Sequence, residues 1–158
     1  MNKLGMVVTV GVVAAAGGFF AGSMAAGTKD PTLTALKDEK WTPIDAKAGD
    51  KGPQMAVVFG DPKAAGKPLG FLLKLPAGFK PGPHTHTSDD YAVVVQGSAH
   101  NFVPGADEGA ALTAGGTWFQ PGKKVHDNHC DSKEDCILFV YTPAGFDFVP
   151  APAAPAKK

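Results

Sequence analysis

The sequence contains no arginine: all fifteen of its basic residues are lysines. Fifteen acidic residues balance them, so the chain carries no formal net charge at pH 7. Proteins that bind nucleic acids usually have a basic excess and use the guanidinium fork of arginine, so we expect no nucleic-acid partner. The lack of arginine also excludes a site that grips phosphate or carboxylate through paired guanidinium hydrogen bonds.

Charge is scarce at the N-terminus. After Lys3, residues 4–26 carry no charged side chain, and this run ends in the small residues Ser23 to Ala26. A short basic start, an apolar run and a small-residue end are typical of a secretory signal peptide. We therefore predict that residues 1–25 are a signal peptide and that the protein is exported, to a periplasm or the exterior. An uncleaved membrane anchor is the alternative, because a run of this length could cross about 30 Å of hydrocarbon; its many glycines favour cleavage.

Cysteine is also rare, with only Cys130 and Cys136 in the chain. An exported protein meets oxidising conditions in which a disulfide persists, and the acidic, polar residues between the two cysteines are typical of a turn. We expect a disulfide here, with free thiols as the alternative. A cysteine zinc site is less favoured because the pair lacks the C-x2-C spacing and a second pair.

The length suits one domain of ordinary size. We predict an N-terminal arm over residues 26–53, with a short helical turn within residues 34–40, a β domain over residues 54–149, and a disordered tail over residues 150–158, which consists of Pro, Ala and Lys. From residue 54 on, short runs of Val, Phe, Leu and Tyr are bounded by Gly, Pro or Asp, a pattern that predicts strands and an all-β sandwich or barrel. The runs are Met55 to Phe59, Leu69 to Leu75, Tyr91 to Gln96, Ala99 to Val103, Ala111 to Leu112, Thr117 to Gln120 and Ile137 to Thr142.

All five histidines lie within the β region, and two of them form the sequence His84-Thr-His86. Residues two apart in an extended segment point to the same face, so both rings can converge on one ion. A third histidine from a distant strand would complete the set. We interpret His100 and His129 as surface or packing residues.

Two segments around these histidines carry a resemblance. Gly78, His84, His86 and Gly97 fit G-x5-H-x-H-x3-E-x6-G, with Asp90 in the place of Glu. Gly115, Pro121 and His126 fit G-x5-P-x-G-x2-H-x3-N, with Lys123 in the place of Gly and Cys130 in the place of Asn. These are the two motifs of the cupin superfamily, and the chain resembles small, single-domain exported cupins of unassigned function.

The resemblance implies a cupin jelly-roll β-barrel that holds a divalent metal through His84, His86, Asp90 and His126. Asp90 is one methylene shorter than Glu, so Asp89 is an alternative ligand or a partner of a ligand histidine, and a site without either carboxylate is a third possibility. Imidazole suits Fe, Zn, Mn, Cu or Ni, and these ligands do not distinguish among them. The resemblance also implies a homodimer.

Two functions follow from such a site. The first is a metal-dependent enzyme, an oxygenase or a relative, that acts on a small oxygenated organic molecule. The second is a non-catalytic ligand-binding or sensor domain with a structural zinc. A third possibility is a barrel that has lost its metal. An open metal position beside a substrate-sized pocket favours the enzyme. The sequence predicts a small-molecule partner, and membrane contact only through an uncleaved signal segment.

Other aromatic and polar residues have plainer interpretations. We expect the aromatic residues of the β region to form mainly the barrel core. Tyr91 is a weak candidate for catalysis, because strand parity places it on the face opposite Asp90. The aromatic residues assigned to the core are Phe71, Phe79, Trp118, Phe119, Phe139 and Tyr141.

Overall fold

The computed structural model describes residues 32–152. The predicted signal peptide, the start of the arm up to residue 31 and residues 153–158 of the predicted tail lie outside the described residues. All the strands of the described residues belong to one compact unit that begins at Thr34.

Strands dominate the described part of the chain, where helical residues are confined to two single turns of 3-10 helix. In chain order the elements are η1 (Leu36–Asp38), β1 (Thr42–Pro43), η2 (Gly49–Lys51), β2 (Gln54–Phe59), β3 (Leu69–Leu75), β4 (His84–Thr85), β5 (Asp90–Gln96), β6 (Ala99–Phe102), β7 (Thr117–Gln120), β8 (Asp127–Cys130), β9 (Cys136–Thr142) and β10 (Val149–Pro150).

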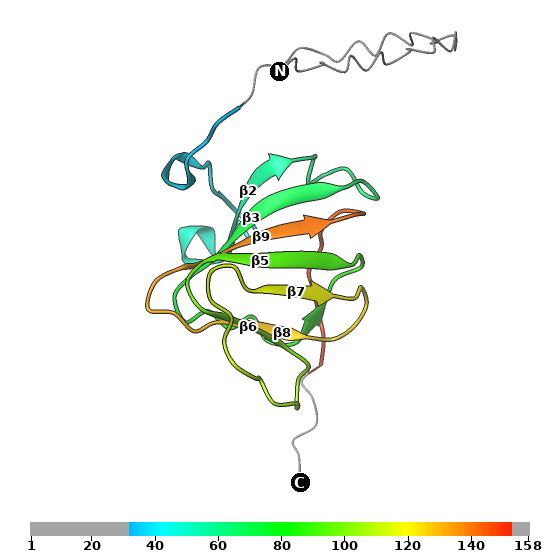
Figure 1. The fold of residues 1–158 in the computed structure, drawn as a ribbon. Coiled ribbons are helices and arrows are strands. Elements are labelled where there is room, and N and C mark those ends of the chain that lie inside the picture. Colours follow the sequence, from blue (N-terminus) through cyan, green and yellow to red (C-terminus); the bar gives the residue numbers. More distant parts are fainter. Residues whose placement is uncertain (1–31, 153–158) are drawn as a thin grey trace, which may run out of the picture. The chain divides into compact units, whose positions relative to one another are not determined.

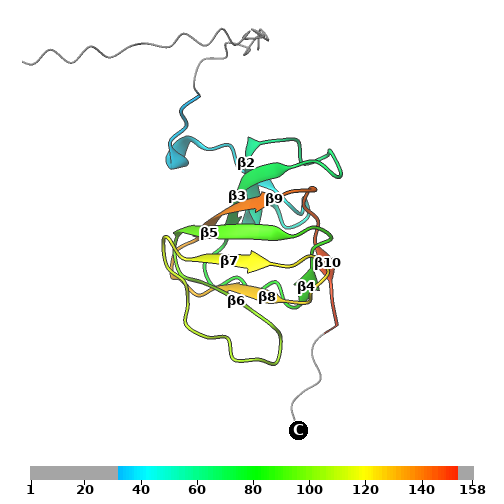
Figure 2. The same ribbon diagram turned by 45° about the vertical axis from the view of Figure 1, so that its right-hand side comes forward.

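The strands form one large and two small antiparallel sheets. The large sheet has the order β1-β2-β3-β9-β5-β7, and the small ones are the pairs β10-β4 and β6-β8. In Figure 1 the β6-β8 pair lies below the β7 edge of the large sheet, and Figure 2 shows β4 and β10 beside it. This order, in which neighbours in space are far apart in sequence, is that of a jelly roll. The all-β cupin barrel predicted from the sequence is confirmed.

Side-chain alternation along the central strands divides the large sheet into an inner and an outer face. On β3 and β9 the inner residues are fully or almost fully buried, whereas the residues between them are mostly half-exposed. The inner side chains of these strands and of β5 form one core, to which Phe71 contributes a fully buried ring. Burial of this apolar surface, at about 25 cal/mol per Å², supplies the main driving force for the barrel.

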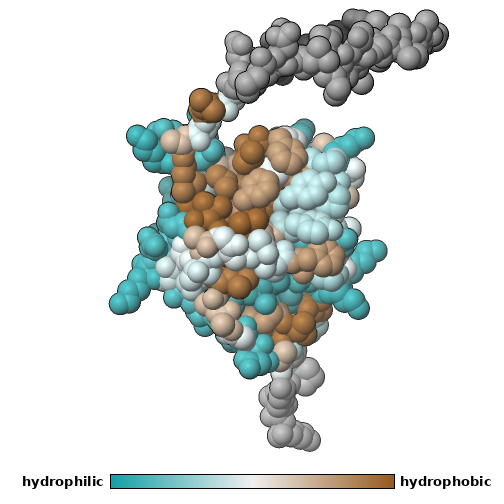
Figure 3. All heavy atoms as spheres, in the orientation of Figure 1, coloured by the Kyte–Doolittle hydropathy of each residue, from teal (hydrophilic) through white to brown (hydrophobic). Residues whose placement is uncertain are grey.

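The outer face of the large sheet is also apolar, as the brown surface in Figure 3 shows. Four rings form a row across it: Phe59, Tyr141, Tyr91 and Phe119 have centroid separations of 6.3, 6.2 and 4.9 Å between successive rings. Phe119 is 50% exposed, so its assignment to the core is wrong, and so are those of Tyr141 and Phe139, which alternate with the buried inner residues of β9. Phe119 pairs in register with Tyr91, and both side chains point away from the barrel, as strand parity predicts for Tyr91.

Both ends of the predicted β domain extend further than the sequence indicated. In the arm, the predicted helical turn is found as η1, and β1 pairs with β2 at the edge of the large sheet. The predicted tail is wrong at its start, because Pro150 pairs with His84 and the Ala151 amide donates to the Pro83 carbonyl at 2.9 Å. A proline is tolerated there because the pair is a two-stranded edge.

Six of the seven predicted strands are found with ends that differ by no more than one residue. The exception is Ala111 to Leu112, where only an isolated bridge between Leu112 and Ala99 forms. The structure adds β4 and β8, which the sequence did not predict. These strands are short and carry His, Asp and Asn, so their composition lacks the apolar pattern by which strands are recognised.

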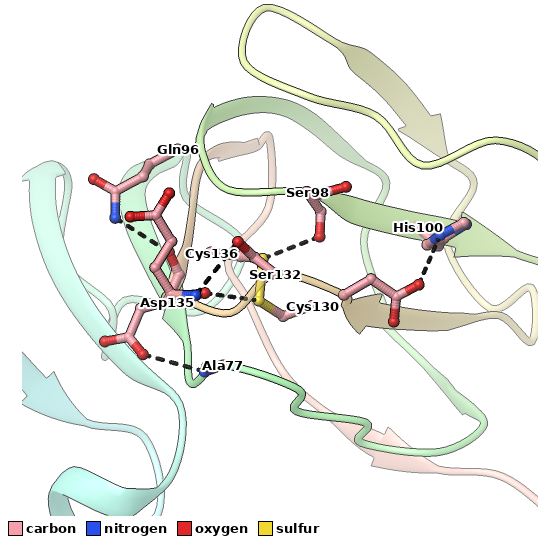
Figure 4. The surroundings of a disulfide bond; sticks show 10 residues. Ala77, Gln96, Ser98, His100, Cys130, Ser132, Asp135 and Cys136 are labelled. Carbon is pink, nitrogen blue, oxygen red and sulfur yellow. Dashed lines mark hydrogen bonds and ion pairs between the residues drawn. A yellow bond between two sulfur atoms is a disulfide. The ribbon is translucent and has the colours of Figure 1, made fainter.

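The expected disulfide between Cys130 and Cys136 is present and links the end of β8 to the start of β9 (Figure 4). The two Cα atoms lie 5.6 Å apart, within the normal range for a disulfide, and both cysteines are fully buried. Asp135 in the enclosed turn accepts hydrogen bonds from the Ala77 amide at 3.1 Å and, through its carbonyl, from the Gln96 side chain at 3.2 Å. The bridge therefore fixes a turn that ties three segments together.

Candidate metal centre

Three histidines meet where the two motif segments pair. His84 begins β4, His86 follows β4, and His126 precedes β8. His84 and His126 form an antiparallel bridge in which each amide donates to the other's carbonyl, at 2.9 and 3.0 Å. The three residues are 1%, 6% and 2% exposed. Backbone pairing thus brings side chains 42 positions apart in the sequence (126 minus 84) into one buried cluster.

The ring nitrogens of this cluster are arranged as metal ligands. One nitrogen from each ring lies within 4.8 Å of the other two. Each Nδ1 faces a backbone carbonyl: that of Gly82 for His84 at 2.8 Å, that of Asp147 for His86, and that of Lys124 for His126 at 3.2 Å. An Nδ1–H that donates to a carbonyl fixes the tautomer and leaves the Nε2 lone pair free to bind an ion.

Burial favours the neutral form of all three rings. Burial lowers the pKa of His84 and of His86 below the ordinary value. Burial, together with the neighbouring His84, lowers the pKa of His126 to about 4. Neutral imidazole is the form that binds metals, so all three rings are ready to ligate at neutral pH. The donor set therefore fits a divalent transition metal.

Asp90 lies beside the cluster, whereas Asp89 does not. Asp90 begins β5, is 5% exposed, and its Oδ2 lies 3.6 Å from Nε2 of His86. Burial and the nearby Asp89 raise the pKa of Asp90 to about 7. The carboxylate of Asp89 instead accepts a hydrogen bond from the Gly122 amide at 2.7 Å. Asp89 therefore fastens the second motif segment to the first, and Asp90 is the carboxylate nearer the histidines, although the ligand atoms that lie within 4.8 Å of one another come from the three histidines alone.

The structure explains how the chain accommodates Lys123, where the cupin pattern has Gly. Lys123 has a φ of 61°, the only positive φ of a non-glycine residue in the described part of the chain. Its amide donates to the His86 carbonyl at 2.7 Å. The adjacent Gly122 allows the close approach of the segments, since a Cβ there would lie 2.8 Å from the Thr87 carbonyl oxygen. The turn needs left-handed backbone, which costs a non-glycine residue about 1–2 kcal/mol.

A C-terminal strap, residues 146–148, closes one side of the cluster and was missed by the sequence reasoning. Phe148 stacks on His84 with 4.4 Å between ring centroids, and Phe146 lies 4.8 Å from His86. Between them, Asp147 holds His86 through its carbonyl, and its carboxylate accepts hydrogen bonds from the amide and hydroxyl of Thr87. The alternation Phe-Asp-Phe before Val149 is the one sequence signal for an extended segment here.

A cavity of about 440 Å³ opens beside the histidines. Its walls come from the inner faces of β3 and β9, from Phe79 and Trp118, from the strap, and from arm residues between Ile44 and Pro53. Small-molecule sites commonly have volumes of about 300–1,000 Å³ and mainly apolar walls. The cluster thus faces a chamber large enough for a small organic molecule.

The remaining histidines lie outside this site, as interpreted from the sequence, yet they are buried. His100 and His129 sit opposite each other on β6 and β8 and are 8% and 7% exposed. His100 Nε2 lies 3.0 Å from an Asp131 oxygen, and His129 lies between Asp127 and Glu108 at 3.4 and 3.7 Å. Asn128, which precedes His129 on β8, lines the cavity. Because side chains alternate along a strand, His129 and its partner His100 point to the other face of the β6-β8 pair. They are packing residues of that face.

Comparisons with solved structures agree with the fold. The structure is similar to KdgF from a Halomonas species (TM-score 0.54, 18% identity, 72% of this chain and 94% of that chain). It is also similar to an RmlC-like cupin from Ralstonia eutropha (TM-score 0.58, 20% identity, 79% of this chain and 76% of that chain). A third similar structure is the polyketide cyclase RemF from Streptomyces resistomycificus (TM-score 0.58, 18% identity, 79% of this chain and 88% of that chain). At these identities the likeness concerns the fold alone.

No curated protein matches the sequence. Within residues 32–152, no helix is long and apolar enough to cross a membrane. The sequence matches the family described as a domain of unknown function, DUF4437, over residues 32–157. The chain therefore belongs to the DUF4437 family, and its fold is that of the cupins.

Proposed function

We propose that this protein is an exported, metal-dependent cupin that acts on a small oxygenated organic molecule. The ion is held by His84, His86, His126 and Asp90. One observation carries the proposal: three neutral rings, each with Nδ1 held by a carbonyl, present free nitrogens within 4.8 Å of one another beside a cavity of about 440 Å³.

The protein's own groups have distinct roles in this proposal. The carbonyls of Gly82, Lys124 and Asp147 orient the rings, and the buried carboxyl of Asp90 adds a negative charge that offsets part of the charge of the ion. The apolar cavity binds the substrate and limits the access of water. When bound, the ion supplies a Lewis acid for a substrate oxygen, and iron, manganese or copper would add redox chemistry.

A cavity at the cluster favours a ligand-binding, catalytic site over a closed structural zinc. A structural zinc site is normally completed by four protein ligands with no free position. Here only the three histidines have ligand atoms within 4.8 Å of one another, with Asp90 beside them on the wall of the chamber, so an ion held by the histidines would have a side that faces the cavity.

Cobalt substitution tests this difference. We expect the metal-free protein to bind one equivalent of Co²⁺ and to develop visible absorption bands, and we expect added azide to shift those bands by binding at the open position. A control variant, His129→Ala, removes a buried histidine outside the site and should behave as the parent does. Cobalt bands that do not respond to azide would support the structural zinc instead.

Export rests on the N-terminal sequence and on the disulfide, which persists in oxidising compartments. Intact mass measurement of protein recovered from the exported fraction tests it. We expect a chain that begins near residue 26. A full-length chain in the membrane fraction would support the uncleaved anchor.

A further inference from the structure

The floor of the cavity beside the histidines is aliphatic. Leu73 and Leu75 on β3 and Leu138 and Val140 on β9 line it, and none of them is more than 7% exposed. They are inner-face residues of adjacent, paired strands, so they form a continuous apolar surface. The backbone polar groups of these strands are engaged in the sheet, and a ligand lying on this floor finds no hydrogen-bond partner there.

The sides of the cavity are aromatic. Phe79, Trp118, Phe146 and Phe148 surround it; Phe148 stacks on His84, and Phe146 lies tilted against His86. Phe146 is fixed in turn against the core, with its ring edge-on to Phe71 at 4.9 Å. Rigid aromatic walls favour flat, apolar ligands, which they contact with little loss of side-chain freedom.

Charged partners for an anionic ligand are scarce. Lys51 is the only basic residue among the described residues that line the cavity, and it is exposed. Asp45 and Asp90 also line it, so apart from the ion itself a carboxylate or phosphate would meet acidic side chains and one exposed lysine. A sugar would place several hydroxyl groups against Leu, Val and Phe, and each hydroxyl left without a partner weakens binding roughly tenfold.

We propose that the ligand of this cavity is an uncharged molecule with a flat, apolar body, such as one or two fused rings, that carries one or two neighbouring oxygen atoms toward the histidines. Sugar acids and phosphorylated compounds fit this cavity less well, because the ion and Lys51 would be their only positive partners in the described part of the structure. This inference rests on the proposed metal site, because the oxygen atoms need the ion as their partner.

Calorimetric titration of the zinc-loaded protein with two probes tests the inference. The uncharged probe is 2,3-dihydroxynaphthalene, and the sugar acid is galacturonate. We expect the naphthalenediol to bind at least tenfold more tightly, with the negative heat-capacity change that accompanies burial of apolar surface. Tighter binding of galacturonate would overturn the inference.

A matched pair of variants tests whether the naphthalenediol binds in this cavity. Phe148→Lys adds a cation to the cavity wall at a residue that is 43% exposed, and Phe119→Lys makes the same change on the outer face of the sheet, where Phe119 is 50% exposed. We expect Phe148→Lys to weaken binding of the naphthalenediol about tenfold and Phe119→Lys to leave it unchanged. Equal effects of the two variants would show that the probe binds elsewhere, and would overturn the inference.

Metal content, measured in the same samples, separates this inference from the proposed function. A protein that takes up zinc yet prefers galacturonate contradicts the ligand class alone. A protein that takes up no metal contradicts the proposed function, and the same titration of the metal-free protein still compares the two probes in the apolar chamber.

Discussion

Replacing Asp147 with alanine should weaken metal binding, although Asp147 offers no ligand atom to the ion. Its carbonyl accepts the hydrogen bond from Nδ1 of His86, and its carboxylate is the anchor that keeps the strap in place. That anchor consists of two hydrogen bonds from Thr87, from the amide at 2.7 Å and from the hydroxyl. Burial opposes ionisation, but these bonds hold the pKa of Asp147 below its ordinary value, so the carboxylate is charged at neutral pH.

The size of the effect follows from those two bonds. Hydrogen bonds to a partly exposed carboxylate contribute about 0.5–1 kcal/mol each, so losing both costs about 1–2 kcal/mol. If the attachment of the strap is weakened by that free energy, the carbonyl of Asp147 no longer holds His86 in its oriented tautomer. Zinc affinity then falls about 5–30-fold. This agrees with the 10–100-fold losses, in order of magnitude, that follow removal of groups that orient metal ligands.

Competition with a zinc-binding dye at pH 7 measures this affinity. Asp61→Ala is the matched control, because the Asp61 side chain accepts only a local hydrogen bond, from the Lys63 amide at 2.9 Å, in an exposed loop. Asp147→Asn, which keeps one acceptor for Thr87, should lie between the two. If Asp147→Ala binds zinc within twofold of the parent protein, or if Asp61→Ala loses as much, the strap does not orient His86.

Further predictions concern stability and oligomeric state. Gly97→Ala should destabilise the protein by about 2–4 kcal/mol in urea unfolding, because Gly97 has a φ of 83° and a Cβ would lie 3.0 Å from Cys136; Gly115→Ala, with a φ of 88° and open space, should cost only about 1–2 kcal/mol, and equal costs would refute the steric argument. Protonation of His126 should cost the metal-free protein stability as the pH falls from about 6.5 to about 4, since the folded-state pKa of His126 lies below its unfolded value, whereas the raised pKa of Asp90, about 7, shifts stability in the opposite direction over this range; His126→Gln should lack the His126 part of this pH dependence, and identical pH profiles of the variant and the parent would contradict it. A homodimer, if it uses the apolar outer face, should dissociate in sedimentation when Tyr91, 48% exposed, is replaced by Lys; a Tyr91→Lys protein that stays dimeric would exclude that face.

The sequence predicted the ligand histidines because their information is local. His84 and His86 are two residues apart on an extended segment, so their spacing placed them together, and His126 was identified by the Gly and Pro pattern that resembles the second cupin motif. The long strands were predicted for the same reason, because alternation of apolar residues is a property of neighbouring positions. Asp90 shows the limit of this reasoning, since only the structure places Asp90 beside His86 and directs Asp89 to the Gly122 amide.

The rest of the site depends on packing between distant segments. The strap reaches His86 from 61 residues away, and the arm lines the cavity only because β1 pairs with β2. Phe119 is exposed because its register with Tyr91 directs both rings outward, although its apolar character alone suggested the core. None of these contacts has a signal in the nearby sequence, because each arises from the order of strands in the sheet.

The most direct test of the central claim is elemental analysis of the purified protein after metal loading and removal of excess metal, with two histidine variants. His84→Ala removes a ring of the cluster, and His100→Ala removes an equally buried ring that contacts Asp131. We predict about one equivalent of a divalent transition metal in the parent and in His100→Ala, and none in His84→Ala. A parent protein without metal, or a His84→Ala protein that keeps a full equivalent, would contradict the account.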